Sequence, residues 1–278
     1  MGYLYVGHIK KALLFSILFP IFIYTQFYIA TIYVNIFTVF LNYTLIVLIY
    51  IYTIYDVLNI ISKKQDKFIK LNKWYFMILF YIVYIIYIIS IKQFIPIKLL
   101  KQPSNSMAST IIIGDTLIVK DNNYIPNRGD IVVFKYTHDT KIYYMKRCVA
   151  KGGDIIALSD KNLYLKPKEN NEFITSHYPK QNIVKINNQL WVVNPYKINN
   201  KGIHNDKLIT KQNSPYQALF DMKPILIPEN SYFMIGDNRD HSNDSRFWGT
   251  VPQKYIVGKV NFIYVNFSDI SRSGMKIK

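Results

Sequence analysis

The sequence has 278 residues, of which 50% are hydrophobic, 16% aromatic and 18% charged, and its formal net charge is +17. A chain this apolar is not intrinsically disordered as a whole. Its single cysteine, Cys148, excludes a scaffold built on internal disulfides and a zinc site made of several thiolates.

The N-terminal part of the chain is dominated by uncharged, apolar stretches. Residues 12–55 form a run of 44 residues without a charge. Because one helix needs about 20 apolar residues to cross a bilayer, this run predicts two membrane spans, at about 12–31 and 36–55. The uncharged residues 74–91 predict a third span. The first run is too long for the apolar region of a cleaved signal peptide. Two spans, with one segment lying in the membrane interface, are the alternative.

The lysines in the short connections predict the orientation of these spans. The loop 56–73 contains five lysines and two aspartates, and Lys10 and Lys11 precede the first span. Because basic residues collect on the cytoplasmic side, we expect both the loop and the N-terminus there. Residues 1–91 would then be the membrane anchor and residues 92–278 would lie outside the cytoplasm. The two-span alternative moves only the N-terminus.

Residues 92–278 are predicted to form a mainly β domain. They contain 27 of the basic and 15 of the acidic residues, so their net charge is +12. The cations are scattered, which favours contact with anionic lipid headgroups over nucleic-acid binding. Branched and aromatic residues predict strands at 115–119, 130–134, 141–147 and 256–267. The polar stretch of about 155–230, with weak strands near 189–193 and 223–227, predicts an inserted β subdomain.

Four short segments of this domain carry possible chemistry. They are 103–110 (PSNSMAST), 128–132 (RGDIV), 144–154 (YMKRCVAKGGD) and 236–246 (GDNRDHSNDSR). The first alone is an ordinary serine-rich loop, and the second favours a turn that leads into a strand. In the third, Lys146 stands in a predicted strand amid apolar residues, and a buried lysine is rare unless it is paired or functional. The fourth is the most distinctive.

In this order, the four segments resemble the sequence boxes of the bacterial type I signal peptidases (leader peptidases), which are membrane-anchored serine proteases with a Ser-Lys dyad. The resemblance covers about residues 95–265. It implies a helical membrane anchor followed by a mainly β catalytic domain of the signal-peptidase type. It also implies a multi-pass protein of the bacterial inner (cell) membrane, with its catalytic domain on the periplasmic or extracytoplasmic side, that removes N-terminal signal peptides from exported preproteins.

The resemblance also implies a role for six polar residues, position by position in the motifs. Ser106 corresponds to the nucleophile and Lys146 to the general base. The supporting residues are Ser104, whose hydroxyl joins the oxyanion hole, Ser242, which hydrogen-bonds the base, and Asp244 and Arg246, which brace the site.

The chemistry requires an uncharged lysine. A serine hydroxyl needs a positioned base, and Ser-Lys is a recognised variant of the catalytic triad. Lysine is a base only when neutral, and burial lowers its pKa from the ordinary value of about 10.4. A carboxylate touching the amine would raise that pKa. We therefore expect Asp244 to pair with Arg246 and Ser242 to be the hydroxyl partner of Lys146.

The expected substrates and partners also follow from the resemblance. The family cuts after small residues, commonly alanine, at the first and third positions before the scissile bond. A peptide bound as an extended strand would place alternate side chains in pockets. Met107 and Met145, beside the catalytic pair, are candidate pocket walls, with ordinary core packing as the alternative. The implied partners are preprotein signal peptides, membrane lipids and the protein-export translocon.

Two positions differ from the family pattern. Ser109 replaces a proline, and residues 150–154 read Ala-Lys-Gly-Gly-Asp where the family has Gly-x-Pro-Gly-Asp. Both changes remove a rigid backbone angle rather than a reacting group. A degenerate homologue that acts as a non-catalytic, membrane-anchored binding protein is therefore the alternative function. The histidines lack zinc-site spacing and residues 240–251 lack the glycine and glutamate of a calcium loop, so we expect no metal and no cofactor.

Overall fold

The computed structural model describes residues 3, 8–32, 36–63, 78, 81, 82, 85, 97–120, 123–198 and 200–277. These belong to two compact units. The first comprises residues 1–96 with 273–275, and the second, here called the β domain, comprises residues 97–272 with 276–278.

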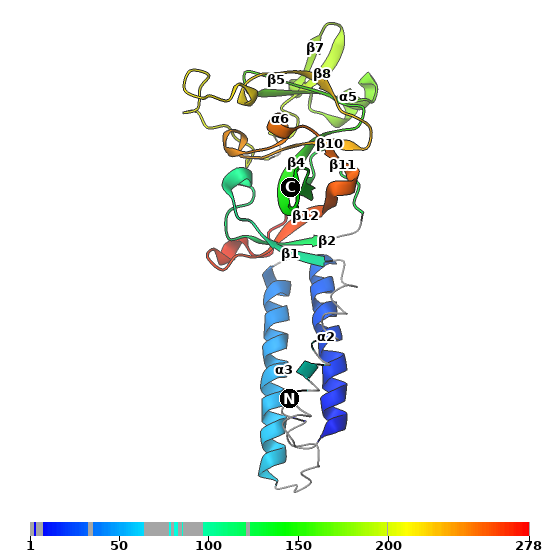
Figure 1. Ribbon diagram of the computed structural model, residues 1–278, viewed down its shortest axis with the longest axis vertical. Helices are drawn as coiled ribbons and strands as arrows, with labels where there is room; N and C mark the ends of the chain where they lie inside the picture. The colour runs from blue at the N-terminus through cyan, green and yellow to red at the C-terminus, as the bar shows by residue number, and fades with distance from the viewer. Residues whose placement is uncertain are drawn as a thin grey trace. The chain divides into compact units, whose positions relative to one another are not determined.

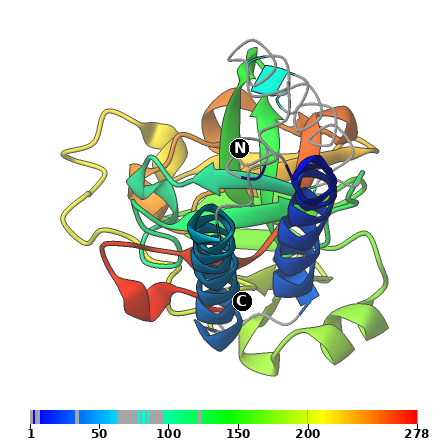
Figure 2. The ribbon, with the colours of Figure 1, turned by 90° about the horizontal axis from the view of Figure 1, so that it is seen from below.

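The first unit contains two long helices that lie side by side, α2 (Ile9–Ile32) and α3 (Ile36–Ser62) (Figures 1 and 2). The Lys11 ammonium lies 2.7 Å from the Asp56 carboxylate, which ties the start of α2 to the last part of α3. The two helices are therefore antiparallel. Among the described residues, Thr44–Ser62 is long and apolar enough to cross a membrane. The third predicted span, 74–91, lies almost entirely outside the described residues, so a three-span anchor stays a prediction.

The β domain is built on two antiparallel sheets. The first has seven strands in the order β1-β2-β12-β3-β4-β10-β11. Its strands are β1 (Ile97–Lys101), β2 (Thr116–Lys120), β3 (Ile131–Tyr136), β4 (Asp139–Lys151), β10 (Ser231–Ile235), β11 (Val251–Pro252) and β12 (Ile256–Val265). The second has five strands in the order β7-β8-β6-β5-β9. Its strands are β5 (Ile155–Ser159), β6 (Asn162–Lys166), β7 (Ile183–Ile186), β8 (Gln189–Val193) and β9 (Met222–Leu226).

Short helical segments connect these strands. They are the α-helices α5 (Asn171–His177) and α6 (Ser245–Trp248) and the 3₁₀ turns η1 (Asn105–Met107), η2 (Lys180–Asn182), η3 (Gln217–Leu219), η4 (Arg239–His241), η5 (Gln253–Tyr255) and η6 (Ile270–Arg272). Within the β domain, β1 and β2 lie at one end and β5, β7 and β8 at the opposite end (Figure 1).

The two sheets share a hydrophobic core. Val149 from β4 and Phe233 from β10 are at most 1% exposed, and they pack in one cluster with Ile156 and Leu165 of the second sheet. A separate cluster includes Met107, Leu117 and other residues of the first sheet. The second sheet is therefore packed onto β4 and β10 as part of one folded domain, rather than linked to it as a loose appendage.

The predicted strands of the β domain are found within a few residues of their expected positions. The sequence predicted 130–134 and 141–147, and the structure has Ile131–Tyr136 and Asp139–Lys151. Both weak strands of the inserted region are present as β8 and β9. Six strands were not predicted, and all of them are short, with two to five residues each: β1, β5, β6, β7, β10 and β11.

A buried ion pair joins a loop of the first sheet to the second sheet. The Arg128 guanidinium donates to both carboxylate oxygens of Asp154, through Nε at 2.7 Å and through an Nη at 2.5 Å, and also to Glu169 at 2.6 Å. The Asp154 side chain is fully buried. Arg128, predicted from the sequence to lie in a turn, is thus a structural cation.

Replacing Arg128 with methionine should therefore leave the Asp154 carboxylate buried without its cation. We expect the free energy of unfolding to fall by about 3–5 kcal/mol, the usual cost of breaking a buried pair from one side. Chemical denaturation of the detergent-solubilised chain measures this change. The exposed Lys180→Met is the control and should change stability little, whereas equal stability of the two variants would contradict a structural role for Arg128.

Candidate active site

The Ser106 hydroxyl is presented by the short turn η1, between β1 and β2, and the residue is 6% exposed. The backbone around it is held from the 236–246 segment. The Asn238 N–H donates to the Ser106 carbonyl at 3.2 Å, and the Asn238 amide donates to the Asn105 carbonyl at 3.1 Å. A Cβ on Gly236 would lie 2.5 Å from the Ser106 carbonyl, so only glycine fits this close approach.

The Lys146 amine is the nearest polar partner of that hydroxyl. Lys146 lies on β4 opposite Val132, and its Nζ donates to Ser106 Oγ at 2.7 Å and to the Met145 carbonyl at 3.1 Å. The residue is only 4% exposed. Burial lowers the pKa of Lys146 to about 8, although the negative charge of Asp244 opposes this shift. About a tenth of this lysine is therefore neutral at pH 7, against roughly one molecule in a few thousand at its ordinary pKa.

A second hydroxyl lies beside the first. Ser104 Oγ is 3.2 Å from Ser106 Oγ. The loop that carries it is fixed by Gln102, which is 4% exposed and whose amide donates to the Ser104 carbonyl at 2.7 Å. Ser104, Ser106 and Lys146 are thus brought together as the sequence predicted.

Asp244 and Arg246 form a fully buried pair, as expected. The Arg246 Nε donates to Asp244 Oδ1 at 2.8 Å and an Nη donates to Oδ2 at 2.9 Å, while the Gly236 N–H donates to Oδ2 at 3.0 Å. Burial alone would raise the pKa of Asp244, but the Arg246 charge and these hydrogen bonds hold it below its ordinary value. Among the described residues, no carboxylate forms an ion pair with Lys146.

The hydrogen bond expected between Ser242 and Lys146 is not formed. Ser242 is 5% exposed, and its hydroxyl acts instead on the Asp244 carboxylate, whose pKa it helps to lower. The reason is the direction of the lysine amine, which donates instead to Ser106 and to the Met145 carbonyl. Ser242 still lies in the site, because its hydroxyl and the Ser106 carbonyl both lie beside Gly236. A Cβ added to this glycine would be 2.3 Å from the hydroxyl and 2.5 Å from the carbonyl.

A cavity of about 410 Å³ opens beside the Ser106–Lys146 pair. Its lining comprises Leu100, Lys101, Gln102, Pro103, Ser104, Ser106, Val133, Ile142, Tyr143, Tyr144, Met145, Lys146, His241 and Asn243. Met145 belongs to this lining, whereas Met107 is fully buried in the core and does not. The core-packing alternative therefore holds for Met107. In the described residues, no group of three or more His, Cys, Asp or Glu side chains could hold a metal ion.

A charged pair behind the site was not predicted from the sequence. The Arg147 guanidinium donates to both oxygens of Asp237, at 2.8 and 2.7 Å, and to the Gly129 carbonyl at 2.6 Å. The Thr110 hydroxyl donates to the same Asp237 at 2.6 Å. Asp237 thus connects the strand of Lys146 to the loop of Ser106. One feature of the sequence could have indicated this pair: Arg147 directly follows Lys146 in a predicted strand, and a buried arginine needs an acidic partner.

A buried amine hydrogen-bonded to a serine hydroxyl, at the edge of an apolar cavity, is the arrangement of a serine hydrolase with a lysine base. Residues 72–265 match the family model described as signal peptidase, peptidase S26. The chain belongs to this family of serine endopeptidases, which confirms the enzyme class predicted from the sequence.

Individual relatives agree with this assignment. The chain is 33% identical to a signal peptidase I of Helicobacter pylori, over 60% of this chain and 74% of that one. It is 36% identical to a signal peptidase I of Buchnera aphidicola subsp. Schizaphis graminum, over 63% and 71% of the two chains. A crystal structure of a signal peptidase I from Enterococcus faecalis aligns with a TM-score of 0.32 and 24% identity, covering 49% of this chain and 97% of that one, which is too distant to support an argument.

The buried amine makes a prediction about stability. Because the pKa of Lys146 falls from 10.5 to about 8 on folding, the unfolded chain binds one more proton than the folded chain between these values. Stability therefore rises with pH across this window, by up to about 3 kcal/mol, and Lys146→Met should remove this rise. Denaturation of both proteins at a series of pH values measures it. If wild type and Lys146→Met changed in parallel between pH 8 and 10.5, while the exposed Lys185→Met did the same, the lowered pKa would be refuted.

Proposed function

We propose that this membrane-bound endopeptidase cleaves signal peptides with Ser106 as the nucleophile and Lys146 as the general base. The observation that carries the proposal is the 2.7 Å hydrogen bond from a buried amine to the serine hydroxyl. A non-catalytic binding protein would have no use for this arrangement. Burial of an amine lowers the stability of the fold, but it also lowers the pKa of the amine and so allows it to act as a base.

The proposed reaction begins with the neutral amine. Lys146 accepts the proton of Ser106 Oγ as this oxygen attacks the scissile carbonyl. The Ser106 N–H and the Ser104 hydroxyl donate to the oxyanion that develops. The Lys146 ammonium then donates its proton to the leaving amine, which leaves an acyl group on Ser106. In the second half, Lys146 takes a proton from the water that attacks this ester, and it returns the proton to Ser106 Oγ as the acyl–oxygen bond breaks, which restores the hydroxyl and the neutral amine.

The remaining site residues have supporting roles in this proposal. Arg246 neutralises Asp244 and so keeps that carboxylate from raising the pKa of the lysine by direct contact. Ser242 is the hydroxyl placed to contact the amine once Ser106 is acylated, since it lies beside Gly236, as the Ser106 carbonyl does. Met145 forms a wall of the cavity for a small side chain before the cleavage site.

We further propose an anchor of three spans within residues 1–91, followed by an extracytoplasmic catalytic domain in residues 92–278 with an insertion at about 155–230. The antiparallel pair α2 and α3 and the lysine-rich loop 56–73 support this orientation. In this topology the active site stands on the side where signal peptides emerge from the export translocon. The net charge of +12 favours contact with anionic lipid headgroups there.

Cleavage of a purified preprotein with an Ala-x-Ala site tests the catalytic assignment. Wild type should release the mature protein, whereas Ser106→Ala and Lys146→Met should not, and Ser104→Ala should lower kcat by roughly 10²- to 10³-fold. The rate of the wild type should rise with pH with an apparent pKa near 8, because only the neutral amine is a base. Sequencing of the new N-terminus identifies the cleaved bond.

Two outcomes would contradict this assignment. Activity that persists in both Ser106→Ala and Lys146→Met would refute the dyad. No activity in any of the proteins, with folding and signal-peptide binding intact, would favour the non-catalytic homologue. Lys185→Met, on an exposed strand of the second sheet, is the control and should retain full activity.

Labelling with a membrane-impermeant maleimide tests the topology in cells whose outer membrane, where present, is permeabilised. Cys148 is fully buried and should not react. Lys185→Cys should be labelled from outside, and Lys63→Cys should be labelled only after the cells are lysed. Gly2→Cys distinguishes three spans from two. With three spans the N-terminus is cytoplasmic and this cysteine should not be labelled in intact cells, whereas with two spans it should be labelled. Labelling of Lys63→Cys in intact cells would reverse the proposed orientation.

A further inference from the structure

The second sheet sends one segment back to the loops of the active site. Residues 202–206, here called the bridging segment, lie in the long connection between β8 and β9. They contact Thr110, which follows Ser106 by four residues, and the stretch 237–241, which leads directly to Ser242. The chemistry proposed above gives this segment no role.

The contact with the loop of Ser106 is unusually close. A Cβ on Gly202 would lie only 2.0 Å from Thr110 Oγ1 and 3.0 Å from the Thr110 backbone nitrogen. The same Oγ1 donates to Asp237 at 2.6 Å. Position 202 therefore has no space for any side chain unless the loop or the segment moves.

The contact with residues 237–241 is made by backbone pairing. The His204 N–H donates to the Asp237 carbonyl at 3.0 Å, and the Arg239 N–H donates to the His204 carbonyl at 3.0 Å. The Asp206 N–H donates to the Asp240 carboxylate at 2.7 Å, and His241 Nε2 lies 3.0 Å from the Asp206 carboxylate. The bridging segment thus runs beside this loop as a short parallel β-bridge.

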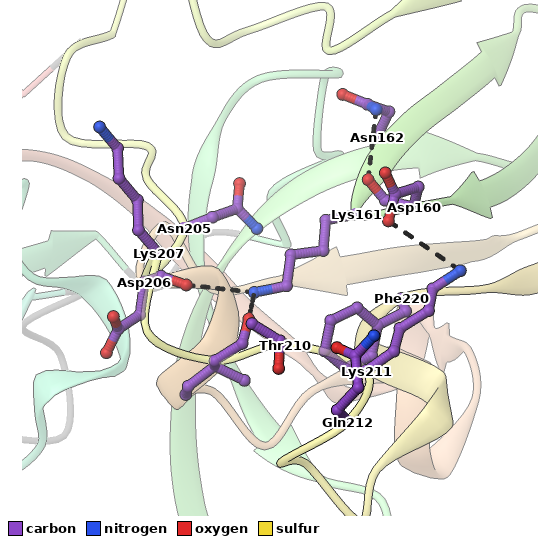
Figure 3. A pocket seen from close by; sticks show the side chains of 11 residues that line it. Asp160, Lys161, Asn162, Asn205, Asp206, Lys207, Thr210, Lys211, Gln212 and Phe220 are labelled. Carbon is purple, nitrogen blue, oxygen red and sulfur yellow. Dashed lines mark hydrogen bonds and ion pairs between the residues drawn. The ribbon is translucent and has the colours of Figure 1, made fainter.

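Lys161, in the turn between β5 and β6, fixes the bridging segment from the other side. Its amine lies 3.0 Å from Asp240 Oδ1, and the Asp240 side chain is fully buried. The same amine donates to the carbonyls of Asp206 and Ile209, at 3.2 and 2.6 Å, and Figure 3 shows it directed into this loop. One cation of the second sheet therefore neutralises a carboxylate of the 236–246 segment.

We propose that the bridging segment and Lys161 are a positioning element of the active site, so that the inserted subdomain supports catalysis. They hold residues 237–242 against the loop of Ser106, and they thereby keep Ser106 in contact with Lys146 and water away from the amine. This role rests on the proposed function of that pair. A shift of about 1 Å in such a site is enough to lower the rate roughly 100-fold.

Three variants test the proposal. Gly202→Ala places a methyl group against Thr110, and Lys161→Met leaves the Asp240 carboxylate without its cation. Both should lower kcat for a signal-peptide substrate by roughly 10- to 100-fold while KM changes little. Lys161→Arg keeps the charge and should recover most of the rate. Lys211→Met is the matched control: Lys211 lies in the same region (Figure 3), but its ion pairs within the described chain are with Asp221, at 2.7 Å, and Asp160, at 3.9 Å, and not with residues 237–242.

The pH profile distinguishes positioning from a loss of folded protein. Burial is the main cause of the low pKa of Lys146, and the charges that act on it are those of Asp244, Arg246 and Asp237. If residues 237–242 move away and admit water, the acid limb of the rate profile should shift to higher pH in Gly202→Ala and Lys161→Met, and not in Lys211→Met. A reduced amount of folded enzyme lowers the rate equally at every pH.

The proposal is overturned if a cooperatively melting Gly202→Ala or Lys161→Met protein keeps the wild-type kcat and pH profile. It is also overturned if the profile does not shift and the rate falls only in proportion to the fraction of folded enzyme, measured by circular dichroism, since the folded molecules then keep the wild-type kcat. If one variant fails to fold, the other decides. Persistent activity of Ser106→Ala would instead refute the catalytic pair itself, so the two failures are distinguishable.

Discussion

The hydrogen bond between the Lys146 amine and the Ser106 hydroxyl is the interaction on which the rest of the structure depends. It serves as a base–nucleophile contact only if the amine loses its proton near neutral pH, so the lysine must be removed from water. The β domain achieves this with a strand position opposite Val132 and with an exposure of 4%. The same burial demands that nearby carboxylates be neutralised by other cations, and Arg246 and Arg147 do this for Asp244 and Asp237.

The loop that carries Ser106 has little regular structure, so buried charges must hold it. At its far end the Asp115 carboxylate, fully buried, accepts hydrogen bonds from Arg272 at 2.7 and 3.0 Å and from Asn266 at 2.8 Å. In its middle, Thr110 donates to Asp237 and its carbonyl accepts from Arg272 at 3.1 Å. Arg272 and the 236–246 segment, both more than 120 positions further along the chain, therefore hold the loop of Ser106 in place.

Much of this arrangement was predictable because it rests on local patterns. Branched and aromatic residues identified the long strands, and the lysine within one of them identified the buried amine. The second partner of the Lys146 amine was not predictable: the amine donates to the Met145 carbonyl and not to Ser242, and this choice is set by the packing of the whole site. The Arg147–Asp237 pair and the contacts of the bridging segment join residues 33 to 92 positions apart, and no periodicity in the sequence predicts such contacts.

The two positions that depart from the family pattern illustrate the same dependence on context. A Cβ on Gly152, where the family has proline, would lie 2.9 Å from the Glu229 Cα and 3.1 Å from the Asn230 nitrogen, so the backbone at this turn excludes proline. Next to Ser109, the Ile111 N–H donates to the Met107 carbonyl at 2.8 Å and Thr110 is held by Asp237. Rigidity that a proline ring would supply locally is here supplied by contacts with the rest of the domain. The missing prolines are therefore no argument for a degenerate enzyme.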